Sequence, residues 1–302
     1  MGSPTADTAI YLGQFEVGSP EWVAARAHGL GGSEIAAVLG LSPWESAFSL
    51  WHRKTGAAAA IPDNDLLRWG RILEPVIVAE YARRHPKRQV TYQPGAMWRN
   101  NTRPWQILSP DALAEDRIFE AKTARDNLGW GEEGTDEVPI YYRCQTLWYL
   151  DGFGLDRADI GVLIGGSDYR EYTVTASPDE AAVLRDEAEN FLATVRAGLR
   201  PPIDGSDITY QLIREQHPDI EPADYPVPME IAEPYLDALA AHKAAEEEKR
   251  RTTAVLADAM HTCRRAIYLG QTIATRVPGR DGKPPYLRAT PVKEPGRKVD
   301  AA

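Results

Sequence analysis

The sequence predicts an α/β fold in which helices flank a central mixed β-sheet, followed by a C-terminal helical arm and a β-hairpin. Three observations predict it. Short helical stretches fill residues 20–56, β-rich pieces separated by Pro, Gly and Asn follow up to residue 124, and a helix and a hairpin come next. The 302 residues are 43% hydrophobic, which is enough to bury a sizeable core.

Composition disfavours several classes of protein. No run of 18 or more apolar residues occurs and the N-terminus lacks a basic-then-apolar signal pattern, so a cytoplasmic protein is expected rather than a membrane or secreted one. Cys144 and Cys263 lie far apart and outside any CxxC, which is typical of a reduced protein without a zinc or iron–sulfur site. The six histidines show no HxH or HExxH spacing, so a histidine-built metal site is not expected.

Net charge leaves nucleic-acid binding open. The formal charge of −10 disfavours it at first, because neutralisation of phosphates dominates such binding. Nine acids and one arginine lie between Asp204 and Asp237, however, and give that stretch a net charge of −8. The remainder is therefore close to neutral at −2, and a local basic groove is compatible with the sequence.

The first expected helices are short, and each is closed by a glycine, as helix C-termini often are. They are EWVAARAHG, SEIAAVLG and ESAFSLWHRKTG. A linker, AAAAIPDN, leads to a longer helical run, DLLRWGRILEPVIVAEYARRH.

The next expected elements are β-rich and form the sheet. They are RQVTYQPG, AMWRNN, PWQILS and EDRIFEAKTA. An aromatic-rich helix, VPIYYRCQTLWYLDGFG, and a hairpin of ADIGVLIGG and YREYTVTA follow. Ser177 or Asp179 opens a last helix, with Pro201 and Pro202 just past its end.

The character of the chain changes near residue 204, which predicts one domain over residues 1–204 and an extension over residues 205–302. The extension begins with an acidic, proline-containing linker and continues as a long polar helix. A β-hairpin around a Gly-Arg-Asp-Gly turn ends it. A docking or oligomerisation element is favoured for this arm over a direct chemical role.

The segment SPDALAEDRIFEAKTA carries the strongest chemical signal. If residues 117–123 form a strand, Glu120 and Lys122 share one face, and Asp111 at the end of the preceding strand can reach the same side. Two converging carboxylates need a cation between them, and oxygen ligands suit Mg²⁺ or Mn²⁺. The alternative is a solvated Glu–Lys pair on an exposed hairpin.

Glu74 and Gln145 extend this pattern. Glu74 lies in a helical stretch that is apolar on nearly every side, and Pro75 after it favours a kink or a new helix start that could aim Glu74 at the metal site. Gln145 stands among aromatic residues and could bind a phosphate or the lysine. The alternatives are a surface glutamate and a buried amide that binds the backbone.

The order Pro110-Asp111, Glu120, Lys122 is similar to that of the PD-(D/E)xK nuclease superfamily. More specifically, residues 20–202 resemble the YqaJ-like viral recombinase family, which is related to the exonuclease of phage lambda. The likeness rests on Trp22, Arg26, Gly32-Ser33, the RILEP that contains Glu74, SPDA, FEAKT and the RCQ of the following helix.

The resemblance implies a role for each of these residues. It implies that Asp111, Glu120 and the carbonyl of Ala121 hold the catalytic metal, that Glu74 holds a second metal or its water, and that Lys122 helps to generate hydroxide. It also implies a 5′-phosphate site at Arg26, Ser33 and Ser109, with Trp22 on the DNA side. One departure stands out, because no basic residue closely follows the opening motif. The first candidates are Arg53 and Lys54.

The resemblance therefore implies a Mg²⁺-dependent 5′→3′ exonuclease acting on double-stranded DNA ends in a phage or prophage recombination system. It further implies a ring-shaped homo-oligomer, a trimer by analogy, and a partner protein that anneals the 3′ single strand. Two alternatives remain open. One is a structure-specific or other DNA endonuclease on the same fold, and the other is a non-catalytic protein that binds DNA ends.

Overall fold

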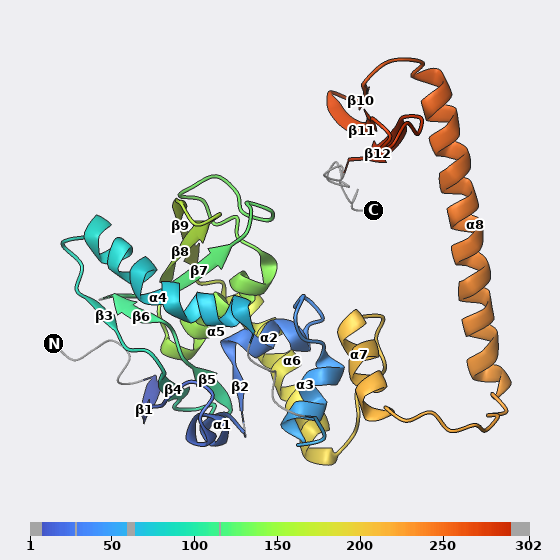
Figure 1. Ribbon diagram of the computed structural model, residues 1–302. Helices are drawn as coiled ribbons and strands as arrows, with labels where there is room; N and C mark the ends of the chain where they lie inside the picture. The colour runs from blue at the N-terminus through green and yellow to red at the C-terminus, as the bar shows by residue number, and fades with distance from the viewer. Residues whose placement is uncertain (1–7, 28, 59–63, 115, 291–302) are drawn as a thin grey trace, which may run out of the picture. The chain divides into compact units, whose positions relative to one another are not determined.

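The computed structural model describes residues 8–27, 29–58, 64–114 and 116–290 (Figure 1). The chain forms two compact units, Met1–Ile220 and Glu221–Ala302. The helices of the first unit are α1 (Pro20–Arg26), α2 (Gly32–Val38), α3 (Ala47–Lys54), α4 (Asp65–Arg84), α5 (Ile140–Phe153), α6 (Pro178–Ala197) and α7 (Asp207–Gln216). Its strands are β1 (Ala9–Gln14), β2 (Leu30–Gly31), β3 (Val90–Tyr92), β4 (Ala96–Asn100), β5 (Gln106–Leu108), β6 (Ala112–Ala114), β7 (Arg117–Ala124), β8 (Arg157–Ile164) and β9 (Asp168–Thr175).

The main sheet of the first unit is mixed. Its strand order is β3-β6-β7-β8-β9, and β7 and β8 pair in parallel while the other neighbours are antiparallel. The parallel pair needs a crossover, which α5 supplies (Figure 1). A second sheet has the order β1-β4-β5-β2. The predicted α/β class with a mixed sheet flanked by helices is confirmed.

Helices cover both faces of the main sheet. On one face, Ile77, Val78 and Tyr81 of α4 pack on Phe119 of β7, with the Tyr81 and Phe119 rings 4.1 Å apart. On the other face, Ile118 joins the buried core that includes α5. Successive side chains of a strand alternate between faces, so Glu120 and Lys122 point with Ile118 toward α5.

Three local features differ from the sequence expectations. Residues 9–14, for which the sequence predicted no element, form β1 and pair with β4. Residues 207–216, expected to be linker, form α7, which packs on α3 through a 2.7 Å bond between the Ser46 and Thr209 hydroxyls. The compact units accordingly divide at Ile220 rather than at residue 204. Finally, α4 is one helix through Pro75, so Glu74 reaches the site without a new helix start.

The second unit consists of one long helix and a small sheet. Helix α8 spans Met229–Ala259, and β10 (Arg265–Tyr268), β11 (Gln271–Val277) and β12 (Tyr286–Ala289) form an antiparallel sheet in that order. Met260 packs with Ala266 and Ala274 in its core. Across the described parts of both units, no helix is long and apolar enough to cross a membrane.

Candidate active site

Glu120 lies at the centre of the candidate site. Its side chain is fully buried, and its Oε2 accepts hydrogen bonds from Lys122 Nζ at 2.8 Å and from Gln145 Nε2 at 3.1 Å. Its other oxygen, Oε1, is buried and has no hydrogen-bond partner among the described residues. A buried carboxylate oxygen without a partner is costly unless a ligand satisfies it.

Asp111 lies beside Glu120 because β6 and β7 pair directly after it. Its Oδ2 accepts a hydrogen bond from the backbone N–H of Ala121 at 2.8 Å. Glu74 reaches the same place from α4, where it accepts a bond from the Tyr92 hydroxyl at 3.2 Å. The structure therefore brings together four side chains that the sequence singled out, and we call Glu74, Asp111, Glu120 and Lys122 the carboxylate cluster.

Burial holds the pKa values of the three carboxylates in this cluster above their ordinary values. Burial, followed by the charge of Asp111, raises the pKa of Glu120 to about 8 and that of Glu74 to about 7. Burial likewise raises the pKa of Asp111. Burial alone would lower the pKa of Lys122, but the charges of Glu120 and Asp111 outweigh it and raise that pKa above its ordinary value.

These features fit a divalent cation held in part by solvent or substrate. No group of three or more His, Cys, Asp or Glu side chains in the described part of the chain could hold a metal ion by itself. Mg²⁺ needs no such group, because it is usually bound through one or two carboxylates, with waters and phosphate oxygens completing its coordination. The unpartnered Oε1 of Glu120 and the raised carboxylate pKa values provide the local evidence for such a cation.

Gln145 and a group of aromatic side chains line the cluster. The Gln145 amide donates to Glu120 and, at 3.4 Å, to the Tyr149 hydroxyl, so Gln145 and Lys122 share Glu120 as acceptor. Lys122 Nζ lies 5.0 Å from the centre of the Tyr142 ring. These tyrosines were not predicted as site residues, because aromatic side chains in a helix are more often core.

An aromatic stack leads from Lys122 toward solvent. The Tyr142 ring lies 4.5 Å from the Tyr141 ring, which in turn lies 4.7 Å from Trp44. Trp44 is 52% exposed although it packs edge-on against Tyr141. The exposed Trp44 ring at the outer end of this stack is a surface on which a nucleobase can stack.

The expected phosphate site also has a defined structure. Arg26 is buried, its Nη2 donates to Ser33 Oγ at 3.3 Å, and its guanidinium lies 4.5 Å from the centre of the Trp22 ring. Trp22 and Arg26 thus share one face of α1, as their spacing predicts. Ser109 has a different contact, since its hydroxyl donates to the Ala96 carbonyl at 2.7 Å.

A buried glutamate forms ion pairs with three cations of this region, and the sequence analysis did not predict it. Glu34 lies 3.4 Å from Arg26, 2.9 Å from Arg53 and 3.1 Å from Lys54. We call these four residues the Arg26 cluster. Against the opposing effect of burial, the three cations hold the pKa of Glu34 far below its usual range. Arg53 and Lys54, the basic candidates named from the sequence, thus lie around the same carboxylate as Arg26.

Two glycines let the Arg26 cluster approach α5. A Cβ on Gly31 would collide with the Arg26 guanidinium, and one on Gly32 would lie 2.6 Å from the Tyr149 ring and 3.1 Å from Gln145 Cγ. The start of α2 therefore packs directly on the helix that carries Gln145. The Gly31 N–H donates to Glu34 Oε2 at 2.8 Å.

Residues 21–152 match the model of the YqaJ-like viral recombinase domain. The family resemblance expected from the sequence motifs is thereby confirmed for this part of the chain. The curated protein YqaJ of Bacillus subtilis (strain 168), described as uncharacterized, is 27% identical over 215 residues, which cover 68% of this chain and 66% of YqaJ. The alignment therefore spans just under two thirds of that relative.

Solved structures of two exonucleases are similar to a part of the chain. The alkaline exonuclease from Laribacter hongkongensis has a TM-score of 0.49 and 18% identity, covering 66% of this chain and 99% of its own. A phage-related exonuclease from Haemophilus somnus 129PT has a TM-score of 0.40 and 13% identity, covering 62% and 96%.

Proposed function

We propose that the chain is a Mg²⁺-dependent exonuclease that degrades double-stranded DNA from 5′ ends and leaves 3′ single strands for a phage-type recombination system. The observation that carries the proposal is the carboxylate cluster, in which the unpartnered Glu120 Oε1 lies beside Asp111 and Lys122. The match to the YqaJ-like viral recombinase domain supports the recombination context.

Asp111, Glu120 and the carbonyl of Ala121 would hold the metal, and Glu74 would hold a second one or its water. Such a cation supplies Lewis-acid polarisation of the phosphate and lowers the pKa of water. Mn²⁺ is expected to substitute for Mg²⁺, because both accept carboxylate oxygens. The bond that Asp111 receives from the Ala121 N–H fixes the carboxylate against β7.

The remaining polar side chains orient and stabilise the reacting groups. Gln145 and Lys122 both donate to Glu120 Oε2, which leaves Oε1 as the free ligand atom. In the proposed reaction the Lys122 ammonium orients the attacking water and helps to generate hydroxide by stabilising its negative charge. Its positive charge, fixed in a buried place, also stabilises the additional negative charge that develops on the phosphate.

The Arg26 cluster is proposed to hold the 5′-phosphate of the DNA end, because its three cations outnumber Glu34 together with Glu45, the second carboxylate bound to Arg53. Arg26 and Ser33 would contact the phosphate, and Ser109 could join them after releasing the Ala96 carbonyl. Trp22 would pack on the DNA end. A homo-oligomeric ring and a single-strand annealing protein as partner are part of the proposal, and both derive from the family resemblance.

The test uses linear duplex DNA with 5′-phosphate or 5′-hydroxyl ends, a closed circle as control, and Mg²⁺. We expect loss of the phosphorylated strand from its 5′ end, an intact circle, and no degradation by a Lys122→Ala variant. Cutting of the circle would instead indicate an endonuclease. Binding of DNA ends without any Mg²⁺-dependent loss would indicate a non-catalytic DNA-end-binding protein.

A further inference from the structure

The small sheet of the second unit has an unusual charge. Residues Arg264–Thr290 contain six basic side chains and one acidic side chain, a net charge of +5 in a chain whose net charge is −10. The rest of that unit up to residue 263 carries nine acids and four basic residues, a net charge of −5. The basic side chains of the sheet are Arg264, Arg265, Arg276, Arg280, Lys283 and Arg288.

Most of these cations are exposed, and their charges are not neutralised within the sheet. Arg276 differs, because it donates to the carbonyls of Ala257 at 2.9 Å and Cys263 at 3.4 Å. The ion pairs among the described residues of this unit, His242–Glu246 and Arg251–Glu248, lie on α8 and involve none of the sheet's cations. Five basic side chains are therefore available to a polyanion.

Strand register places two of the cations and two tyrosines on one face of the sheet. Arg265 pairs with Thr275 and Thr275 with Arg288, while Tyr286 pairs with Val277 on the same side. Beyond the bulge in β10, Tyr268 pairs with Gln271 and returns to this face. The opposite face carries Ala266 and Ala274, which pack toward Leu256 and Met260.

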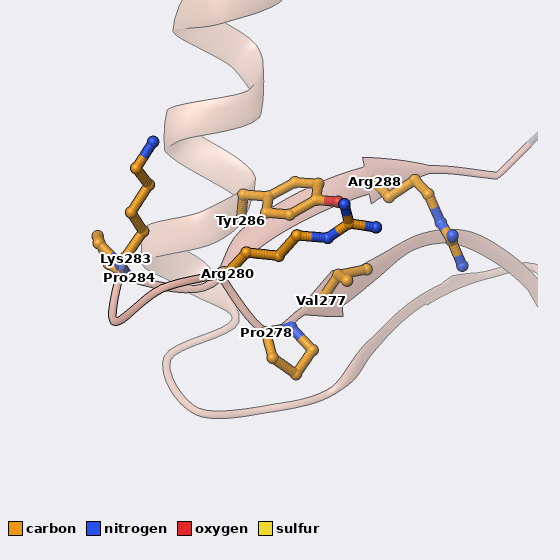
Figure 2. A pocket seen from close by; sticks show the side chains of 8 residues that line it. Val277, Pro278, Arg280, Lys283, Pro284, Tyr286 and Arg288 are labelled. Carbon is orange, nitrogen blue, oxygen red and sulfur yellow. The ribbon is translucent and has the colours of Figure 1, made fainter.

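The two tyrosines are exposed, 65% for Tyr268 and 56% for Tyr286. Figure 2 shows the Arg280 side chain extended alongside the Tyr286 ring, with Arg288 further along the sheet. The same residues line a hollow with Val277, Pro278 and Pro284, while Lys283 points away from its centre (Figure 2). Exposed rings among cations offer stacking surfaces as well as phosphate contacts.

We propose that this face, defined by Arg265, Tyr268, Arg280, Tyr286 and Arg288, binds single-stranded DNA. Phosphate contacts alone would need only cations, but aromatic stacking requires bases that are not paired, so the tyrosines favour a single strand over a duplex. The choice of DNA over RNA rests on the proposed function, whose product is a 3′ single strand. The binding itself is separate from the catalytic residues.

Fluorescence anisotropy of the full chain, with a labelled single-stranded oligonucleotide and a matched duplex, tests the proposal. EDTA is present throughout, so the result does not depend on whether the protein cuts DNA. The variant Arg265→Gln/Arg280→Gln/Arg288→Gln removes three cations from the face. The control Lys243→Gln/Lys249→Gln/Arg250→Gln removes the same charge from the exposed surface of α8.

We expect the face variant to bind the single strand at least tenfold more weakly than the parent protein. The slope of log affinity against log salt should fall in magnitude by about 2, because each lost phosphate contact accounts for roughly 0.7. The control should leave both unchanged. Tyr286→Ala should weaken single-strand binding about tenfold, and Tyr286→Phe should restore it. Equal losses of single-strand affinity in the face variant and the control would overturn the proposal. A loss of affinity confined to the duplex would overturn it too. Circular dichroism spectra matching the parent protein confirm that each variant is folded.

Discussion

The first unit buries two charge clusters with opposite imbalances. The carboxylate cluster sets three acids against Lys122, with Arg71 also acting on Glu74, whereas the Arg26 cluster sets three cations against Glu34, with Glu45 also bound to Arg53. The pKa values of the acids differ accordingly. The pKa of Glu120 is raised to about 8, whereas the pKa of Glu34 is held far below its usual range. One cluster lacks positive charge and the other lacks negative charge.

The excess charge of each cluster determines which kind of ion it can bind. A buried excess of carboxylates is relieved by a cation, and a buried excess of cations is relieved by an anion such as a terminal phosphate. The two clusters meet where Gly31 and Gly32 bring the start of α2 against α5. A DNA end held by the second cluster would therefore present its phosphodiester near the first.

The largest effect is expected from Glu120→Gln, which keeps the size of the side chain and removes its charge. We expect nuclease activity to fall by at least about 10³-fold, since an amide is a poor ligand and cannot replace the buried carboxylate at the metal. The rate of release of nucleotides from linear duplex DNA measures it. Glu80→Gln, which removes an exposed carboxylate paired with Arg83 and Arg84 on α4, is the matched control and should keep the parent rate. Parent activity in Glu120→Gln would remove the carboxylate cluster from the mechanism.

Glu34→Gln should act on stability rather than on chemistry. Removing the acid leaves Arg26 and Lys54 without their shared partner and Arg53 with Glu45 alone, which is expected to cost about 3 kcal/mol of the free energy of unfolding. Urea denaturation measures the change. Adding phosphate should restore part of the loss, because an anion can take the place of the carboxylate. A variant as stable as the parent protein would contradict the imbalance assigned to this cluster.

The two clusters should also respond oppositely to pH in the metal-free protein. Glu120 and Glu74 keep their protons up to about pH 8 and 7 when folded, whereas the unfolded chain releases them near 4.3. The folded state thus binds more protons over this range, and stability from these groups is full below about pH 4 and is lost as pH rises through 8. Glu34 has a lowered pKa, so its contribution is present above about pH 4 and is lost only in stronger acid.

Denaturant unfolding in EDTA between pH 4 and 9 measures this dependence. Glu120→Gln should flatten the decline between pH 5 and 8, since the amide does not titrate. Glu34→Gln should lower the whole curve over the same range without flattening it. A parent protein whose metal-free stability rises from pH 5 to 8 would contradict the raised pKa values.

The smallest effect is expected at the aromatic stack. Trp44→Ala removes an exposed ring from Tyr141 and should raise KM for DNA about fivefold while kcat stays near the parent value, as expected for the loss of one stacking contact. Trp44→Phe should recover most of the affinity. Steady-state kinetics on duplex DNA measure KM and kcat for each variant. An effect confined to kcat would contradict a role in DNA binding and indicate that the stack acts through Lys122.

Local sequence pattern was sufficient for the carboxylate cluster and insufficient for the Arg26 cluster. The spacing of Glu120 and Lys122 is a property of one strand, and Asp111 belongs to the adjoining hairpin, so alternation and motif order locate all three. Glu34 was missed because it occupies the first turn of a helix, where an acid is ordinary. Its partners Arg53 and Lys54 come from α3, and only tertiary packing brings them together.

In the fold, too, local sequence pattern predicts some elements, and tertiary packing decides the others. The helices and strands of residues 20–200 follow periodicity and turn residues, and most of them lie where the sequence predicts. The strand β1 and the helix α7 do not, because each is stabilised by a partner far away in sequence, β4 for the one and α3 for the other. The hydrogen bond between Ser46 and Thr209, for example, joins residues that no local pattern connects.

Calorimetric titration of Mn²⁺ into the metal-free protein shows whether the carboxylate cluster binds a divalent cation. We expect saturable binding that releases protons near pH 7, because Glu120 and Glu74 must lose theirs. This binding should disappear in Glu120→Gln and persist in Glu34→Gln. Mn²⁺ binding of equal strength in the parent protein and Glu120→Gln would contradict this expectation.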